Sequence, residues 1–89
     1  MIKTVSISIT GKVQGVWFRK YTQEKAQQLT VTGYVKNLYD SSVFIVATGT
    51  EIQLQELINW CWHGSPKSKV EHVHVHELEL QLFAGFVIE

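Results

Sequence analysis

The chain has 89 residues, of which 45% are hydrophobic and 18% charged, a composition typical of a globular domain and not of a disordered chain. The formal net charge is zero, which argues against general binding to nucleic acids or membrane surfaces, and no apolar run approaches the roughly 18 residues that a membrane span needs. A single cysteine allows no internal disulfide. We therefore expect residues 1–89 to form one domain in the reducing cytoplasm.

The first half of the chain predicts two strands around a helix. Residues 5–10 alternate between apolar and polar side chains, as in a strand with one solvent-exposed face. A loop follows from Gly11 to Gly15. Residues 18–30 then place their apolar side chains on one face of a helix. Residues 32–37 form the second predicted strand, which ends at Asn37.

The middle of the chain predicts a turn, a buried strand and a well-marked helix. Residues 38–42 are typical of a turn, and residues 43–48 are rich in the β-branched and aromatic residues of a central strand. Thr50 and Gln53 form a capping box, which makes Thr50 the predicted N-cap. The residues expected on the apolar face of this helix are Leu54, Leu57, Ile58 and Cys61, and its stop signals are Gly64 and Pro66.

The end of the chain predicts a long strand and a short one. Residues 70–82 are strand-like, but the leucines from Leu78 onward have the opposite parity to Val73 and Val75. A bulge or a change of strand is therefore expected between Val75 and Leu78. Residues 86–88 form the last short strand.

This order of elements predicts an α+β fold, a ferredoxin-like βαββαβ sandwich plus a short C-terminal strand, in which two helices cover one face of an antiparallel sheet. In that topology the first two predicted strands run the same way with the third between them. Their C-terminal ends therefore share one rim of the sheet, roughly 9–10 Å apart. The loop after the first strand and Asn37 meet at this rim, and Asn37 has the parity of Val35, which points it toward the helices.

The loop that leads into the first helix is the strongest candidate for an anion site. Six basic and two acidic side chains lie in residues 1–48, and this balance is reversed in residues 49–89. Successive backbone N–H groups in such a loop can form an anion nest, and the helix N-terminus adds further donors. Arg19, the only arginine, adds a planar fork that suits two phosphate oxygens. A glycine pair near an arginine is, by itself, equally compatible with a plain connecting turn.

Longer motifs favour the anion site over the plain connecting turn. Residues 11–19, GKVQGVWFR, closely resemble the acylphosphatase signature G-x-V-Q-G-V-x-F-R. Residues 33–37, GYVKN, resemble the second signature of that family at the expected distance. Residues 60–66 and 70–73 resemble its helix end and fourth strand, so that the resemblance covers essentially the whole chain.

The resemblance implies a small metal-independent hydrolase that splits the carboxyl–phosphate bond of acyl phosphates by direct in-line attack of water, with no cofactor and no covalent intermediate. Its phosphate-binding arginine falls on Arg19 and its water-positioning asparagine on Asn37. The N–H groups of the phosphate-binding loop fall on Gln14, Gly15, Val16, Trp17, Phe18 and Arg19. The expected partners are an acyl phosphate and inorganic phosphate, the latter as product and inhibitor. Nucleic acid and membrane are not expected as partners, and the protein is expected to be a monomer.

The residues of the two motifs agree with such chemistry. A carboxylate leaves without protonation, so no general acid is needed, and phosphoryl transfer depends mainly on positioning and charge stabilisation. Neither motif contains His, Asp or Glu, so an oxygen of the substrate phosphate is the expected acceptor of the water proton. The sequence departs from the family at Thr30 and Ser41, where glycine is often or usually found, which puts the geometry of two turns in question.

Two other groups of residues are candidates, for a metal site and for a reactive thiol. On one strand face, His72, His74 and His76 lie roughly 6.6 Å apart, so two can reach one metal ion and three would be strained; a solvated sheet face is the favoured interpretation. Cys61 is expected to be a packed thiol, and the tryptophans on either side of it cannot both point inward.

The main alternative to an enzyme is an RNA-binding module, because ferredoxin-like folds often bind RNA on their open sheet face. That face of the first strand carries only the small hydroxyl side chains of Thr4, Ser6, Ser8 and Thr10, which does not favour this alternative.

Overall fold

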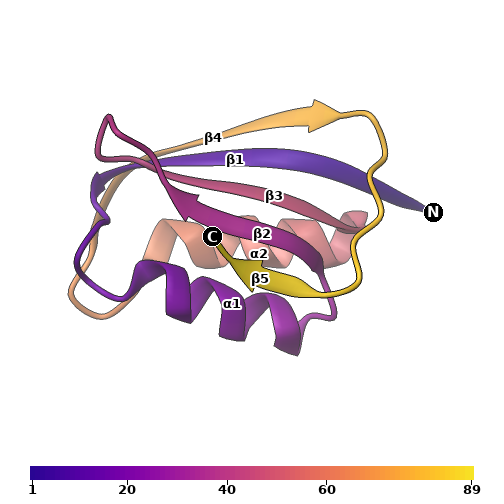
Figure 1. Cartoon of the computed structure of the whole chain (residues 1–89), viewed down its shortest axis with the longest axis horizontal. Helices are drawn as coiled ribbons and strands as arrows, with labels where there is room; N and C mark the ends of the chain where they lie inside the picture. Colours follow the sequence, from indigo (N-terminus) through magenta and orange to yellow (C-terminus); the bar gives the residue numbers. More distant parts are fainter.

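The computed structural model describes all 89 residues (Figure 1). It contains one five-stranded sheet of order β4-β1-β3-β2-β5, and both helices lie on the same face of this sheet. The predicted βαββαβ sandwich with a short C-terminal strand is therefore confirmed. Its elements are β1 (Ile2–Lys12), α1 (Phe18–Gln28), β2 (Thr32–Asn37), β3 (Val43–Thr50), α2 (Glu51–His63), β4 (Lys69–Leu78) and β5 (Phe86–Ile88).

The strand directions bring the ends of β1 and β2 to one rim, as predicted. Both strands pair antiparallel with β3, which lies between them, and β4 pairs antiparallel with β1. The added strand β5 runs parallel to β2, so the sheet as a whole is mixed. This direction arises because the chain crosses from the end of β4 to the start of β2 before it enters β5, where Gly33 donates to the carbonyl of Gly85 at 2.9 Å.

The core fills the space between the sheet and the helices. Ile7, Ile45 and Val35 project from the three central strands and are completely buried. Phe18 and Leu57 face them from the two helices. Trp60 packs on Phe18 with ring centroids 5.4 Å apart, whereas Trp62 is exposed, which confirms that only one of the two tryptophans points inward.

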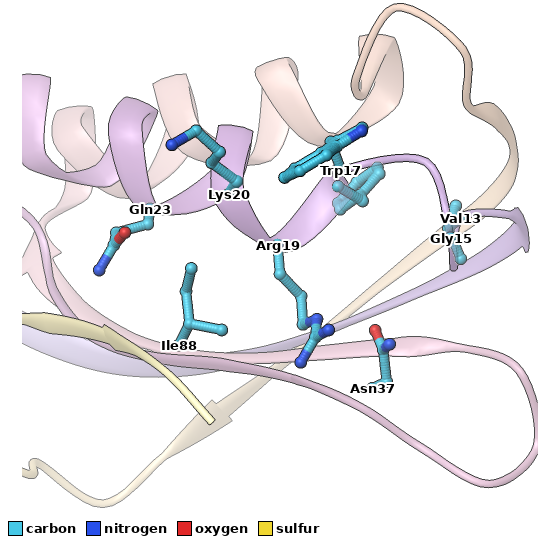
Figure 2. A pocket seen from close by; sticks show the side chains of 9 residues that line it. Val13, Gly15, Trp17, Arg19, Lys20, Gln23, Asn37 and Ile88 are labelled. Carbon is cyan, nitrogen blue, oxygen red and sulfur yellow. The ribbon is translucent and has the colours of Figure 1, made fainter.

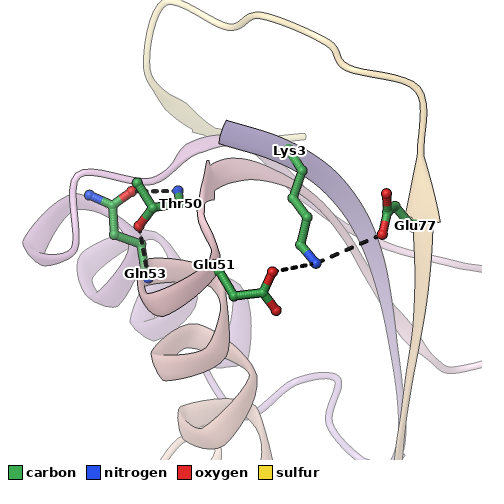
Figure 3. Close-up of polar contacts among 5 residues, drawn as sticks. All are labelled: Lys3, Thr50, Glu51, Gln53 and Glu77. Carbon is green, nitrogen blue, oxygen red and sulfur yellow. Dashed lines mark hydrogen bonds and ion pairs between the residues drawn. The ribbon is translucent and has the colours of Figure 1, made fainter. Parts of the chain in front are cut away.

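The start of α2 confirms the predicted capping box. The Thr50 hydroxyl accepts from the backbone N–H of Gln53 at 3.2 Å, and the Gln53 amide oxygen accepts from the N–H of Thr50 at 2.9 Å (Figure 3). At the same end of the molecule, Lys3 contacts Glu51 at 2.9 Å and Glu77 at 3.8 Å (Figure 3). All three side chains reach solvent, so these ion pairs add little stability.

The prediction of a fully solvent-exposed face on β1 is wrong at its first half. Thr4 and Ser6 are buried. Residues 79–85 cross this face of the sheet, where the carbonyl of Gln81 accepts from Thr48 Oγ1 at 2.7 Å and its N–H donates to Thr4 Oγ1 at 2.9 Å. The crossing segment covers part of the face that an RNA-binding module would need.

The expected bulge or change of strand between Val75 and Leu78 is also wrong. Pairing between β1 and β4 is regular from Leu78 to His72, and β4 ends at Leu78. Leu78 is the last residue of β4 and pairs with Thr4, on the sheet face that the crossing segment covers, whereas Leu80 and Leu82 belong to the crossing segment and not to a strand. The irregularity lies instead at Gly11, whose φ is 123° and where a Cβ atom would lie 2.1 Å from the carbonyl oxygen of Lys69. Only glycine allows this close approach.

Both turns that depart from the family have a left-handed residue. Thr30 has a φ of 57° and Ser41 a φ of 75°, a region that favours glycine. At Thr30 the side chain gains a partner, because its hydroxyl accepts from the Gln53 amide at 2.9 Å. The predicted effect of these substitutions on turn geometry therefore concerns the backbone conformation of Thr30 and Ser41 themselves.

The alternative sites behave as ordinary structural features. His72, His74 and His76 are exposed on β4, and the first two rings lie 5.7 Å apart. Nowhere in the structure are three or more His, Cys, Asp or Glu side chains grouped so that they could hold one metal ion. Cys61 is completely buried, and burial raises the pKa of its thiol, so the unreactive protonated form dominates. Neither helix is long and apolar enough to cross a membrane.

Candidate active site

A pocket of about 500 Å³ lies at the rim where β1 and β2 end and α1 begins (Figure 2). Its lining brings together the two residues that the motifs single out, Arg19 and Asn37. Gly15 and Trp17 of the connecting loop also line it, together with Ile88 of β5. The pocket therefore joins segments from both ends of the sequence.

The loop between β1 and α1 presents free N–H groups. Gly15 and Trp17 have φ values of 71° and 64°, and such left-handed residues bend a loop so that successive N–H groups converge. The N–H groups of residues 14–17 donate to no carbonyl. Those of Phe18 and Arg19 stand in the first turn of α1, where helical partners are absent. The predicted phosphate-binding loop, residues 14–19, therefore has the donors that an anion requires.

Side chains hold this loop from both sides. The Gln14 amide donates to the carbonyls of Leu38 and Ser42, both at 2.8 Å, and so ties the loop to the turn after β2. On the other side, the hydroxyl of Ser65 donates to the carbonyl of Val16 at 2.7 Å. Ser65 was missed by sequence reasoning, which treated residues 64–66 only as the end of α2.

The turn that receives Gln14 is itself fixed by a side chain. The Asp40 carboxylate accepts hydrogen bonds from the hydroxyl and from the backbone N–H of Ser42. These two hydrogen bonds hold the pKa of Asp40 below its ordinary value. The turn thus offers the carbonyl of Ser42 to Gln14 in a defined position.

Arg19 extends from the first turn of α1 across the pocket toward Asn37 (Figure 2). Its Nη1 donates to the main-chain oxygen of Glu89 at 3.0 Å, which leaves the rest of the guanidinium fork free for a ligand. Lys20 also lines the pocket, and no acidic residue does. The charges at this rim therefore favour an anion.

Asn37 ends β2 and lies on the same sheet face as Val35, as predicted. Its Oδ1 atom is buried and has no hydrogen-bond partner. A buried amide oxygen without a partner costs about 1–3 kcal/mol, and such groups are rare in folded proteins outside functional sites. The terminal torsion of asparagine is broad, so the amide can turn to offer either its oxygen or its nitrogen to the pocket.

These groups together define what the pocket can do chemically. Backbone N–H groups and a guanidinium can hold a tetrahedral oxyanion, and an amide can orient a water molecule beside it. The lining contains no Ser, Cys, His, Asp or Glu that could serve as a nucleophile or as a general base. The arrangement suits a reaction in which positioning and charge stabilisation are sufficient.

Comparison with known proteins gives consistent matches over nearly the whole chain. A family model described as acylphosphatase matches residues 5–88. The acylphosphatase of Shewanella amazonensis is 49% identical over 88 residues, which cover 98% of this chain and 97% of that protein. The structure of an acylphosphatase from Coxiella burnetii superimposes with a TM-score of 0.96 at 34% identity and covers 99% of this chain and 93% of that one. The acylphosphatase from Bacillus subtilis gives a TM-score of 0.95 at 38% identity, covering 100% and 99% of the two chains.

Proposed function

This chain belongs to the acylphosphatase family of acid-anhydride hydrolases, and we propose that it cleaves acyl phosphates by direct in-line attack of water, without a metal ion or a covalent intermediate. The observation that carries this mechanism is the unpaired, buried Oδ1 of Asn37 in the wall of a pocket that is also lined by a loop of free N–H donors. Such a pairing of groups supplies one position for a phosphate and another for a water molecule.

In this mechanism the phosphoryl group is held by Arg19 and by the N–H groups of residues 14–19. The free part of the guanidinium fork binds two phosphate oxygens, and the loop donors bind the others. These groups are already in place before the substrate arrives, because Gln14 and Ser65 fix the loop. Charge that develops on the phosphoryl oxygens is therefore stabilised without reorganisation.

Asn37 positions the attacking water. Its carbonyl oxygen accepts a hydrogen bond from that water and directs the water oxygen at phosphorus. The new P–O bond forms as the bridging P–O bond breaks, and the bond electrons leave with the carboxylate. The water proton passes to a phosphate oxygen, so the products are a carboxylate and inorganic phosphate. A carboxylate needs no proton to leave, which agrees with a pocket that has no general acid.

The scheme assigns phosphate binding to Arg19 and the chemical step to Asn37, and variants of the two residues can test this division. Arg19→Ala should weaken phosphate binding and abolish turnover, since hydrogen bonds to a charged group contribute about 1.5–3 kcal/mol each. Arg19→Lys should restore binding better than rate, because it keeps the charge but lacks the fork. Asn37→Ala should leave phosphate affinity near wild type while kcat falls steeply. Asn37→Asp should impair both, because it places a negative charge beside the phosphate.

The assay follows release of phosphate from acetyl phosphate and from phenyl phosphate, with phosphate affinity measured by titration and folding by circular dichroism. Asn59→Ala is the matched control, since Asn59 is an exposed asparagine on α2 whose partner is Gln55. Comparable rates on the anhydride and the monoester would contradict the mechanism. Loss of phosphate binding in folded Asn37→Ala, as severe as in Arg19→Ala, would contradict the division between the two residues.

The organisation of the chain is part of the proposal. We propose that residues 1–89 act as one domain, supported by the single apolar cluster that joins the sheet to both helices, and that the protein is a monomer. A cytoplasmic location is supported by the one buried, unpaired cysteine. Inorganic phosphate is both product and competitive inhibitor in this scheme, because it fits the loop that binds the phosphoryl group.

A further inference from the structure

The strand β4 forms an unpaired edge of the sheet. It pairs only with β1, and no other strand lies along its outer side (Figure 1). None of its residues is buried, and Val75 is 40% exposed although it pairs with the completely buried Ile7. The backbone N–H and C=O groups along such an edge are free to pair with another strand. This long edge, with its exposed valine, is therefore a candidate interaction surface.

The charges along β4 decide which strand this edge can accept. Lys69 lies at its start and Glu77 near its end, with no lysine or arginine between them. Charged side chains on an edge strand usually prevent pairing between copies. Here the opposite signs lie at opposite ends, so a second copy of β4 that runs antiparallel brings each lysine to a glutamate. The charge pattern of the edge is therefore complementary to itself.

One register of this antiparallel pairing satisfies the charges. In it residues 69–77 of the two copies pair, and Lys69 lies opposite Glu77 of the second copy. A shift by two residues in one direction places Glu71 opposite Glu77, and like charges directly opposite each other are destabilising. The same shift in the other direction places Lys69 opposite Val75 and loses the charge pair.

The same register gathers four imidazoles on one side of the joined sheets. His72 and His74 pair with Thr10 and Ser8, so both lie on the open face, away from the helices. Their rings lie 5.7 Å apart within one copy. In this register His72 of each copy lies opposite His74 of the other, and directly opposite side chains have Cβ atoms about 4.5–5.5 Å apart. The four rings therefore surround one position between the two strands.

Four imidazoles in this arrangement fit a tetrahedral zinc ion. Zinc binds histidine nitrogens at about 2.0–2.1 Å, so two of its nitrogen ligands lie about 3.3 Å apart. Rings whose centroids are 5.7 Å apart can turn two nitrogens to that spacing, because the nitrogens lie on the ring perimeters. Within a single copy, no three His, Cys, Asp or Glu side chains are grouped so that they could hold a metal ion. The site is therefore incomplete without the second copy.

The ion is needed because pairing of two edges is a narrow contact. Stable interfaces between proteins bury about 1,200–2,000 Å² in total. Two strands joined edge to edge bring together mainly one row of backbone groups from each copy, which is a small part of such an area. Bonds to a shared ion add a contribution that only the paired copies can supply.

We propose that zinc joins two copies of this chain through antiparallel pairing of their β4 edges, with His72 and His74 of each copy as its four ligands. Without zinc the chain is the monomer proposed above. Neither histidine lines the pocket at the other rim, so this assembly is separate from the proposed hydrolysis and does not depend on it.

The test measures the molecular mass of the full chain by sedimentation, with zinc sulfate and with a chelator. We expect the mass to double with zinc, at one zinc per two chains by metal analysis, and to return to that of the monomer in chelator. His72→Gln and His74→Gln should each stay monomeric at zinc concentrations that join the wild type. His76→Gln and His63→Gln should dimerise as the wild type does, because His76 lies opposite Val70 in this register and His63 lies on α2.

A charge reversal tests the register. Lys69→Glu places two glutamates opposite each other at both ends of the paired strands and should raise the zinc concentration needed for dimerisation about ten-fold. Adding Glu77→Lys restores opposite charges and should return that concentration toward the wild-type value. Zinc bound by monomers, a dimer that persists in chelator, or loss of the dimer in folded His76→Gln overturns the inference. A double variant that dimerises no better than Lys69→Glu overturns the register and the four-histidine site with it.

Discussion

Replacing Ser65 by alanine should damage the proposed phosphate-binding loop without removing any group that we assign to ligand binding. Ser65 is 3% exposed, and its hydroxyl donates to the carbonyl of Val16 at 2.7 Å. The substitution removes this hydrogen bond and leaves a buried acceptor unpaired, a loss of about 2 kcal/mol in the free energy of unfolding. For a domain of this size, that corresponds to a fall in Tm of roughly 8–16 °C.

The effect on the site should exceed the effect of instability alone. Val16 lies between the two left-handed residues of the loop, Gly15 and Trp17, so freeing its carbonyl allows the N–H groups on either side to move. Misplacement of positioning groups by about 1 Å can lower rates by up to 100-fold. We therefore expect Ser65→Ala to weaken phosphate inhibition and lower kcat/KM by about ten-fold, measured at a temperature where the variant is fully folded.

Ser68→Ala provides the comparison that separates these effects. Ser68 lies in the same turn and donates to the carbonyl of Ser65 at 2.7 Å, but it makes no hydrogen bond to the loop. It should lower Tm while leaving the inhibition constant of phosphate unchanged. If Ser65→Ala bound phosphate as the wild type does, or if the two variants weakened it equally, the bond to Val16 would not be what holds the loop in its binding conformation.

Four further outcomes are expected. Inorganic phosphate should inhibit competitively and raise Tm, because at one hundred times its Kd it adds about 2.7 kcal/mol to the free energy of unfolding. A Tm that does not respond at inhibitory concentrations would contradict a shared site. Replacing His72, His74 and His76 together by glutamine should leave kcat/KM unchanged with and without a chelator, whereas activity lost in chelator and restored by a divalent metal would point to a metal-dependent enzyme. Ser41→Gly should stabilise the fold by about 0.5–1 kcal/mol in denaturant titrations, because relief of the left-handed strain exceeds the added entropy of the unfolded chain. Thr30→Gly should gain less, because it also loses the bond from Gln53, and an equal gain at both positions would show that this bond is worth nothing.

The elements that could be predicted are those whose signals are local. The residues that define the alternation in β1 follow one another in a short stretch of sequence. The two residues of the capping box of α2 are only three positions apart. The placement of Asn37 on the helix side also follows from local parity with Val35. The roles proposed for Arg19 and Asn37 follow instead from the resemblance of two motifs, because spacing alone does not separate an anion site from a plain turn.

The features that could not be predicted depend on contacts between distant residues. The backbone N–H of Gln81 donates to the hydroxyl of Thr4, which is 77 positions away in the sequence. Because the donor is a backbone group, no pattern of side chains predicts that residues 79–85 cover the sheet. The bond from Ser65 to Val16 spans 49 positions and uses a backbone carbonyl that every residue possesses. The amide of Gln14 could be recognised as part of a motif, but its partners at Leu38 and Ser42 appear only once the two loops share a rim.

The groups assigned to the substrate are also the groups that the fold leaves unsatisfied. The left-handed backbone of Trp17 and the buried oxygen of Asn37 are unfavourable in the free protein, and at the same rim the N–H groups of residues 14–17 donate to no group of the protein. The apolar core and the side-chain hydrogen bonds around the loop hold them there. A phosphoryl group with its water would give acceptors to the N–H groups and a donor to the buried amide oxygen at once, so the cost of leaving that oxygen unpaired is recovered on binding. On this argument, Trp17→Gly relieves the left-handed strain at the rim without substrate and should raise the free energy of unfolding in denaturant titrations, whereas a variant less stable than the wild type would contradict the argument.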